Sequence, residues 1–239
     1  MYRSLIAILL MVGVLADDLK LRLTTEDDPP HNMLKGTVVV GSSTEKLSRA
    51  FKETGQSFAV DLYPWARAYD LALTREKYCV FSTARTEPRE LLFDWIGPID
   101  SMDWVIYTRS DNPAKPGNLE MLRSETIGGY NQDVISNWLI EQHYQVDAAT
   151  EDSVNVRKLR MGRLRYWATS RPRATALLAG GEPNIIPLFT FGHTDLYLAC
   201  HKGLPADFLA RANAILARMR SDGTFDKIDN TYRSTATRN

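Results

Sequence analysis

Strand-like and helix-like patterns of hydrophobic residues alternate along the chain. Residues 19–25 alternate apolar and polar side chains, as a half-buried strand does, and the charged, proline-containing stretch 26–30 ends this strand in a loop. Ser42 and Glu45 then form a capping-box pattern ahead of apolar residues that share one helical face, and Gly55 marks the end of that helix. This part of the chain therefore predicts a strand, a loop and a helix.

The alternation continues towards the C-terminus. Pro64 fits the first turn of a helix that carries Trp65. Further strands are expected at 58–62, 78–82, 103–108, 126–130, 166–169, 184–189 and 195–200, and further helices at 133–142, 152–163, 171–178, 205–220 and 225–232. Strands that alternate with helices of this length predict parallel sheets with right-handed crossovers. We therefore expect the α/β fold class.

The N-terminal residues have the composition of a cleavable signal peptide. A short basic start leads to an apolar stretch from Leu5 to Leu15, and Ala16 supplies the small residue that a signal peptidase needs. The apolar stretch is shorter than the ~20 residues of a spanning helix, and a buried N-terminal helix is the disfavoured alternative. We expect residues 1–16 to be removed on export, and no lipid anchor, because no Cys follows the cut site.

The overall charge gives no indication of a nucleic-acid partner. The sequence holds 29 basic and 29 acidic residues, so its formal net charge is zero. A chain without a net positive field does not attract a polyanion. We therefore expect no nucleic-acid binding.

The two cysteines leave two interpretations open. Cys79 and Cys200 both lie in apolar, strand-like stretches. An oxidising compartment would permit a disulfide between them. Two buried free thiols are an equally good interpretation, because the sequence does not give their separation.

Motifs of the common enzyme classes are absent from the sequence. It contains no Gly-x-Ser-x-Gly elbow, no His-Glu-x-x-His, no phosphate-binding glycine-rich loop and no Cys-x-x-Cys pair. The four histidines are scattered, whereas a metal site needs clustered donors. We expect no catalytic residue, no metal site and no cofactor.

Aromatic, hydroxyl and arginine side chains follow successive predicted strands. Tyr63 and Trp65 come after one strand, and Ser82, Ala84 and Arg89 come at or after the end of the next. Ligands of open α/β sheets bind beyond the carboxyl ends of the strands. The tryptophan can pack the apolar part of a polar ligand, and the arginine can hold a carboxylate through two parallel hydrogen bonds. The alternative is a core tryptophan and a surface arginine paired with a neighbouring glutamate.

This arrangement resembles the bacterial extracellular solute-binding proteins of family 3, the polar amino acid-binding components of ABC transporters. The likeness covers nearly the whole chain after residue 16. It is carried by the segments 24–30, 63–67 and 85–90 and by the ending from Leu204 through Asp222-Gly223-Thr224-Phe225 to Tyr232.

The resemblance implies a type II periplasmic binding protein-like fold with two α/β lobes joined by a double-crossover hinge. The chain would cross near 97–100 and near 191–193. Lobe one would comprise 17–99 and 193–239, and lobe two would comprise 100–192. In this family the lobes close over the ligand.

The resemblance also implies which residues face the ligand. Arg89 matches the arginine that grips the ligand carboxylate in amino acid-binding relatives, and Ser82 and Ala84 match positions that supply hydroxyl and backbone contacts. Residues 131–133 open a helix at the cleft, where backbone N–H groups favour an anionic group. The full expected ligand-binding set is Glu26, Asp28, Tyr63, Trp65, Ser82, Ala84, Arg89, Asn131, Gln132, Asp133 and Ser170.

Three positions depart from the family's pattern. Ser170 stands where amino acid-binding relatives place the acid that receives the ligand ammonium, and Arg165 and Lys77 replace two further aspartates. The stretch 157–173 is consequently basic, with Arg157, Lys158, Arg160, Arg163, Arg165, Arg171 and Arg173. These residues can favour an anionic ligand, but a solvated basic helix face is the better-supported interpretation.

The resemblance therefore implies a periplasmic solute-binding protein that captures a small polar or anionic solute for the membrane component of an ABC importer. One alternative is a dehydratase-like periplasmic enzyme of the same fold, with Glu26, Asp28 or Asp133 as acid or base. Another is a ligand-binding module for a sensor or other protein partner. We expect a monomer.

Overall fold

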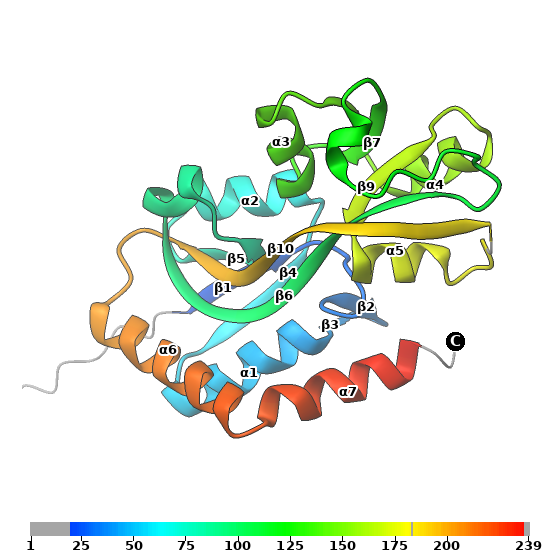
Figure 1. The fold of residues 1–239 in the computed structure, drawn as a ribbon. Coiled ribbons are helices and arrows are strands. Elements are labelled where there is room, and N and C mark those ends of the chain that lie inside the picture. Colours follow the sequence, from blue (N-terminus) through cyan, green and yellow to red (C-terminus); the bar gives the residue numbers. More distant parts are fainter. Residues whose placement is uncertain (1–19, 183, 237–239) are drawn as a thin grey trace, which may run out of the picture.

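The computed structural model describes residues 20–182 and 184–236, so the expected signal peptide 1–16 lies outside the described residues. Figure 1 shows a large sheet flanked by helices. The strands are β1 (Leu21–Thr25), β2 (Met33–Lys35), β3 (Val38–Val40), β4 (Phe58–Leu62), β5 (Tyr78–Ala84), β6 (Phe93–Arg109), β7 (Thr126–Tyr130), β8 (Gln145–Ala149), β9 (Tyr166–Ser170) and β10 (Ile185–His201). The helices are α1 (Ser42–Thr54), α2 (Trp65–Thr74), α3 (Val134–Glu141), α4 (Ser153–Arg160), α5 (Arg171–Leu178), α6 (Ala206–Ser221) and α7 (Thr224–Ala236), with short 3₁₀ helices η1 (Glu87–Leu92) and η2 (Leu119–Leu122).

The main sheet is mixed. Its strand order is β4-β1-β5-β10-β6-β9-β7-β8, and β2 and β3 form a separate hairpin. β1 pairs in parallel with β4 and β5, and β7 pairs in parallel with β8 and β9. β10 is antiparallel to β5 and β6, and β6 is antiparallel to β9. The α/β class is confirmed, whereas parallel pairing holds only towards the two ends of the sheet.

β6 and β10 are much longer than the strands that the sequence predicts. The pattern gave 103–108, 184–189 and 195–200 as three separate strands, but β6 and β10 pair with each other along almost their whole length. An antiparallel ladder is held by backbone hydrogen bonds and needs no apolar side chains at every position. The exposed residues between the apolar segments therefore remain in the strand.

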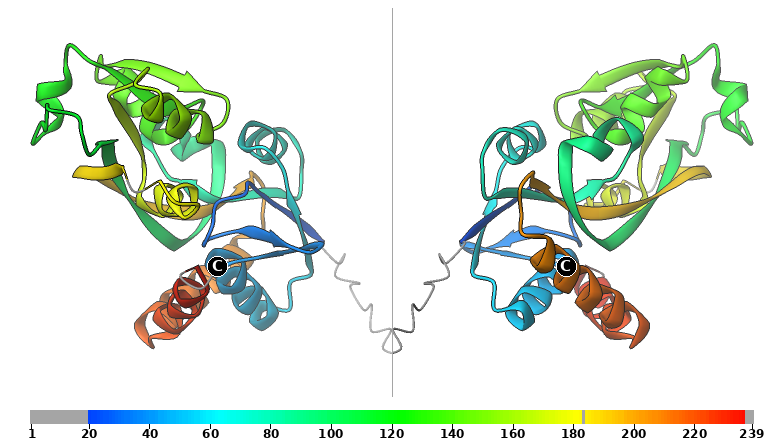
Figure 2. Two further views of the ribbon diagram at one scale, coloured as in Figure 1. Left: turned by 90° about the vertical axis from the view of Figure 1, so that its right-hand side faces the viewer. Right: turned by 90° about the vertical axis from the view of Figure 1, so that its left-hand side faces the viewer.

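β6 and β10 join two lobes, which are best seen in Figures 1 and 2. Lobe one contains β4, β1 and β5 with α1, α2, α6 and α7, and lobe two contains β9, β7 and β8 with α3, α4 and α5. In lobe one, α1, α6 and α7 cover a core that includes Leu23 and Phe51. In lobe two, Ile127 and Trp167 belong to separate buried clusters. The residue boundaries expected for the lobes stay a prediction, because β6 and β10 pass through both without a break.

Two predicted helix starts are corrected by the structure. Gly41 is the N-cap of α1, and the Ser42 and Ser43 hydroxyls donate to Asp100 at 3.1 and 3.2 Å. The predicted capping box at Ser42 is therefore wrong, because the Ser42 hydroxyl donates its hydrogen bond to Asp100, which is distant in the sequence. Pro64 is the N-cap of α2 and does not lie in its first turn.

A disulfide decides the question that the sequence left open for the cysteines. Cys79 of β5 and Cys200 of β10 are opposite each other in the antiparallel pair and are bonded. Both are fully buried in the core of lobe one. The disulfide therefore ties β10 to lobe one.

Candidate functional site

A pocket lies between the lobes at the carboxyl ends of β1, β5 and β9. Its cavity volume is about 30 Å³, below the roughly 300–1,000 Å³ of small-molecule sites, so the two lobes lie close together around it. It is lined by Glu26, Asp28, Trp65, Ser82, Ala84, Arg89, Met102, Asp133, Val134, Ile135, Thr169, Ser170 and Arg173. Most of the expected ligand-binding residues are in this set; their contact with a ligand stays a prediction.

Three expected residues lie outside the pocket wall. Tyr63 packs beside the buried cluster around Trp65, and the guanidinium of Arg67 lies 4.5 Å from the centre of its ring. Asn131 and Gln132 are exposed, and Gln132 has a φ of 60°, so this turn before α3 keeps both side chains away from the pocket. These three residues are thus absent from the pocket lining, and their contact with a ligand stays a prediction.

Arg89 projects from η1 against two aromatic rings. Its guanidinium carbon lies 5.8 Å from the centre of the Trp65 ring and 5.0 Å from that of Tyr69, and it donates to the carbonyl of Ala84 at 3.3 Å. Among the described residues, no carboxylate lies within ion-pair distance of Arg89. The neighbouring Glu90 pairs with Arg85 instead. Arg89 is thus a half-buried cation, open to a ligand anion, and Trp65 is both a core residue and part of the wall.

Two helix N-termini meet the pocket, and side chains of the chain itself cap both. Asp133 accepts a hydrogen bond from the backbone N–H of Ile135 at 3.1 Å at the start of α3. Ser170 accepts one from the N–H of Arg173 at 3.3 Å at the start of α5. Ser170 is therefore the N-cap of α5. Asp133 is the remaining lobe-two carboxylate in the wall.

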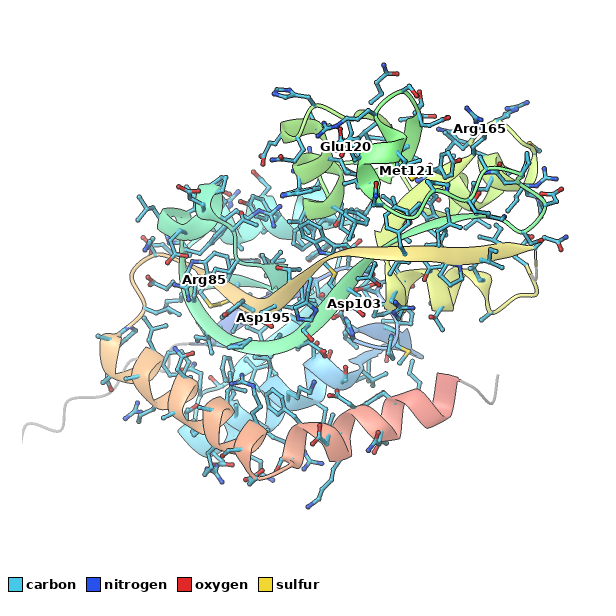
Figure 3. All side chains as sticks on the ribbon, in the orientation of Figure 1. Arg85, Asp103, Glu120, Met121, Arg165 and Asp195 are labelled. Carbon is cyan, nitrogen blue, oxygen red and sulfur yellow. A yellow bond between two sulfur atoms is a disulfide. The ribbon has the colours of Figure 1, made fainter. Side chains whose placement is uncertain are left out.

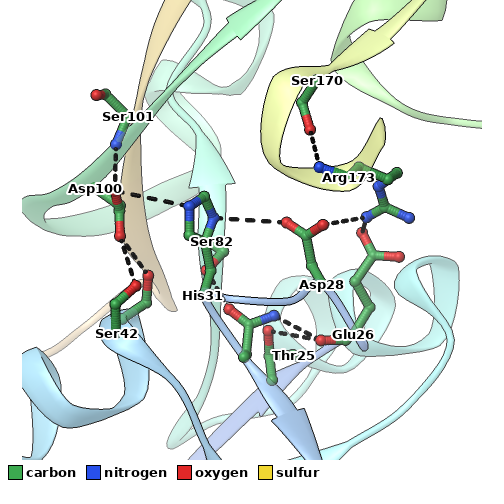
Figure 4. Close-up of polar contacts among 12 residues, drawn as sticks. Thr25, Glu26, Asp28, His31, Ser42, Ser82, Asp100, Ser101, Ser170 and Arg173 are labelled. Atoms are coloured by element: carbon green, nitrogen blue, oxygen red, sulfur yellow. Dashed lines mark hydrogen bonds and ion pairs between the residues drawn. The ribbon is translucent and has the colours of Figure 1, made fainter. Parts of the chain in front are cut away.

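The other end of the pocket is acidic and is crossed by an ion pair between the lobes. Nη2 of Arg173 lies 3.0 Å from Glu26 Oε1 and 3.3 Å from Asp28 Oδ1. Tyr130 donates its hydroxyl to Glu26 at 3.1 Å. Side chains of both lobes are therefore in direct contact across the pocket, as Figure 4 shows for Arg173.

Burial shifts the pKa values of the pocket carboxyls. Burial raises the pKa of Glu26 to about 7, against the opposing charge of Arg173, and raises that of Asp133 to about 6. Burial alone would also raise the pKa of Asp28, but Arg173 and His31 together hold it below its usual value. The pocket therefore contains two carboxyls that titrate close to neutral pH and one that stays charged.

A line of charged groups runs from the pocket into lobe one (Figure 4). Buried His31 lies between Asp28, at 3.7 Å, and Asp100, at 3.8 Å. Burial disfavours the imidazolium, but Asp100 and Asp28 outweigh that effect and raise the pKa of His31. Asp100 is in turn 3.1 Å from the fully buried Lys46. These contacts connect the acidic end of the pocket to α1.

Arg173 is the functional candidate that the sequence interpretation missed. The solvated-surface interpretation is right for much of the basic stretch: Arg157 is exposed, and Lys158, Arg160, Arg165 and Arg171 pair with surface acids. Figure 3 shows Arg165 at the surface of lobe two. Of the basic residues in this stretch, only Arg173 lines the pocket. One feature of the sequence could have indicated its role. Arg173 lies in the first turn of a helix that directly follows the end of a strand, where ligand sites of α/β folds are found.

No group of three or more His, Cys, Asp or Glu side chains is placed to hold a metal ion in the described part of the chain. No helix within 20–182 and 184–236 is long and apolar enough to cross a membrane.

Comparison with protein families gives one match. The family described as bacterial extracellular solute-binding proteins, family 3, matches residues 21–235. No curated protein sequence matches the chain.

Solved structures share this fold at low identity. A mutant of ArgBP from T. maritima is 17% identical with a TM-score of 0.77, over 90% of this chain and 95% of that one. The amino acid ABC transporter substrate-binding protein AbpA from Streptococcus pneumoniae, bound to L-arginine, is 13% identical with a TM-score of 0.77, over 91% and 95%. A histidine kinase sensor domain with similarity to periplasmic binding proteins is 20% identical with a TM-score of 0.79, over 89% and 95%.

Proposed function

Because the chain belongs to the bacterial extracellular solute-binding proteins of family 3, we propose that it captures a small carboxylate-bearing solute of the amino acid type between its lobes. The observation that carries this proposal is Arg89, a half-buried guanidinium on the pocket wall without a carboxylate partner in the described chain. A planar guanidinium holds a carboxylate through two charge-assisted hydrogen bonds.

Asp133 completes the recognition of a zwitterion in this proposal. It lines the same pocket from lobe two, where burial raises its pKa and the positive charge of Arg89 is among the effects that oppose this rise. An α-carboxylate at Arg89 and an α-ammonium at Asp133 would bring the lobes together around one small molecule. Trp65 and Met102 supply apolar surface beside these groups.

The test is a ligand screen followed by one substitution and a matched control. Residues 17–239 are screened with amino acids and organic acids by thermal shift, and hits are titrated by calorimetry. Losing a hydrogen-bonded charge costs about 1.5–3 kcal/mol, so Arg89→Ala should weaken a carboxylate hit about ten- to hundredfold. Arg85→Ala, which removes an exposed arginine paired with Glu90, should leave affinity within about twofold. Equal affinity in wild type and Arg89→Ala would contradict the proposed role of Arg89.

We further propose that the chain is exported and delivers its solute to an ABC importer. The family is described as extracellular, and the similar AbpA is a substrate-binding protein of an ABC transporter. We propose that residues 1–16 direct export. N-terminal sequencing of the exported chain should then begin at Asp17; a chain that retains Met1 outside the cell would contradict this cut site.

The likeness to a histidine kinase sensor domain favours a second candidate, a ligand-binding module that reports to a protein partner. Uptake of the labelled hit by cells with and without this chain distinguishes the two. Lost uptake supports the importer, whereas normal uptake with a lost transcriptional response supports the sensor. Binding without catalysis is proposed in both cases, in line with the family.

A further inference from the structure

The acidic end of the pocket has the groups that bind a guanidinium, and the chain fills it with its own arginine. Glu26 and Asp28 lie 3.0 and 3.3 Å from the same nitrogen of Arg173. The Arg173 guanidinium carbon lies 5.0 Å from the centre of the Tyr130 ring. Carboxylates and an aromatic face are the partners that a guanidinium prefers.

Arg173 is held in this place by more than its ion pairs. Its backbone N–H donates to Ser170, so the residue belongs to the capped first turn of α5. Its side chain is only 17% exposed, as is that of Glu26. Tyr130 fixes the other oxygen of Glu26 through its hydroxyl. A cationic group of a solute would have to displace an anchored side chain to reach the two acids.

Asp28 shows that this end of the pocket can accept a better-placed cation. Asp28 is 7% exposed, and its Oδ1 is buried without a hydrogen bond, although Arg173 lies at ion-pair distance. A buried carboxylate oxygen without a hydrogen bond is energetically costly. A guanidinium that, unlike that of Arg173, is not anchored to α5 could form hydrogen bonds with both Glu26 and Asp28.

We propose that Arg173 determines specificity by occupying this guanidinium site from within the chain, so that the pocket rejects solutes with a cationic side chain. This inference rests on the proposed function for the solute's carboxylate, which binds at Arg89. With Arg173 in place, Glu26 and Asp28 are already paired. The preferred solute has a neutral side chain.

The first experiment uses methylguanidinium, which has no carboxylate and therefore does not depend on Arg89. Thermal midpoints are measured for wild type, Arg173→Ala and the control Arg171→Ala. Arg171 lies on the same helix but contacts Asp103 and Thr190 outside the pocket. At about 100 times its dissociation constant, methylguanidinium should raise the midpoint of Arg173→Ala by at least about 5 °C. Wild type and Arg171→Ala should shift by less than about 1 °C, and tetramethylammonium at equal concentration controls for ionic strength.

Adding Glu26→Gln and Asp28→Asn to Arg173→Ala should abolish the methylguanidinium shift. A shift in Arg173→Ala no larger than that in wild type would overturn the proposal. Carboxylate binding that is unchanged in Arg89→Ala would instead overturn the proposed function, so the two failures are distinguishable.

A second measurement uses wild type alone, in case Arg173→Ala folds poorly. L-arginine and L-citrulline have the same length, but citrulline has a neutral side chain. Calorimetry should show that wild type binds L-citrulline at least as tightly as L-arginine. A tenfold preference of wild type for L-arginine would overturn the proposal whatever the variant does.

Discussion

Nζ of Lys46 lies 2.7 Å from Oδ1 of Asp229, so a fully buried ammonium group joins α1 to α7. The same nitrogen lies 3.1 Å from Asp100 of β6. One cation therefore joins two helices of lobe one to β6, although the three elements are far apart in the sequence.

Replacing this cation should destabilise lobe one strongly. Lys46→Met would leave Asp100 and Asp229 without their shared partner, and breaking a buried pair in this way costs about 3–5 kcal/mol. Urea unfolding should show this loss, whereas Lys52→Met on the exposed last turn of α1 should change stability by less than about 0.5 kcal/mol. Adding Asp229→Asn to Lys46→Met should recover part of the loss. Equal stability of the two methionine variants would show that the ion pair is not structural.

The stability of the protein should fall as the pH rises from about 4.5 to 7. The folded-state pKa values of Glu26, about 7, and Asp133, about 6, lie above the ordinary 4.5 and 3.8. The folded state therefore binds more protons than the unfolded state in this window, and stability decreases as they are released. His31 acts in the same direction above about pH 6.5, because its folded-state pKa is raised above that ordinary value.

Asp133→Asn tests this pH dependence directly. Asparagine keeps the N-cap of α3 but cannot titrate. The variant should flatten the fall in stability between pH 4 and pH 6 by about 1–3 kcal/mol, measured by urea unfolding. Asp226→Asn on the exposed surface of α7 is the control and should follow wild type. A pH profile of Asp133→Asn that matches wild type would mean that Asp133 titrates normally in the folded protein.

The Cys79–Cys200 disulfide should contribute substantially to stability. It closes a loop with a sequence separation of 121 residues, and removing a native disulfide typically costs about 2–5 kcal/mol. The double variant Cys79→Ala/Cys200→Ala should lower the free energy of unfolding by this amount. Wild type treated with a reductant should approach the variant's thermal midpoint, whereas the variant should not respond to the reductant. An unchanged urea midpoint in the variant would contradict the prediction.

The crossing between the lobes should not accept a side chain at Gly192. A Cβ atom there would lie 2.6 Å from the Trp104 ring, whereas one at Gly117 would meet nothing within 4 Å. Overpacking of this kind costs about 1–3 kcal/mol. Gly192→Ala should therefore lower the thermal midpoint, and Gly117→Ala should leave it unchanged within about 1 °C. Gly192→Ala with the midpoint of wild type would show that Trp104 moves without cost.

The pocket residues that follow strand ends could be predicted from the sequence. Glu26 and Asp28 come directly after an alternating strand, Ser82 and Ala84 end another, and Ser170 ends a third. The carboxyl ends of the parallel strands β1 and β5 meet at one edge of lobe one, so a local pattern is enough to bring the first four of these residues together. Ser170 joins them because β6 and β10 place lobe two against lobe one. The helices and the strands with apolar alternation were predictable from local patterns of the same kind.

Features that depend on distant partners could not be predicted in this way. Arg171 and Arg173 stand on either side of one proline, and only the orientation of α5 decides that Arg173 enters the pocket. The bond of Ser42 to Asp100 depends on where β6 passes α1. The strand β8 was missed because its side chains are largely exposed and give no apolar alternation.

The disulfide also constrains the order in which the chain can complete its fold as it is synthesised. The elements from β6 to β10 form a continuous stretch of the chain, so lobe two can assemble as soon as that stretch has been synthesised. Lobe one cannot be completed before the C-terminal part of the chain is present. Its strand β5 pairs with β10, and its helix α1 packs against α6 and α7. Cys79 appears early and must stay unpaired until Cys200 follows it. The cysteine that emerges first is therefore the position at which a wrong intermolecular bond would form during biogenesis.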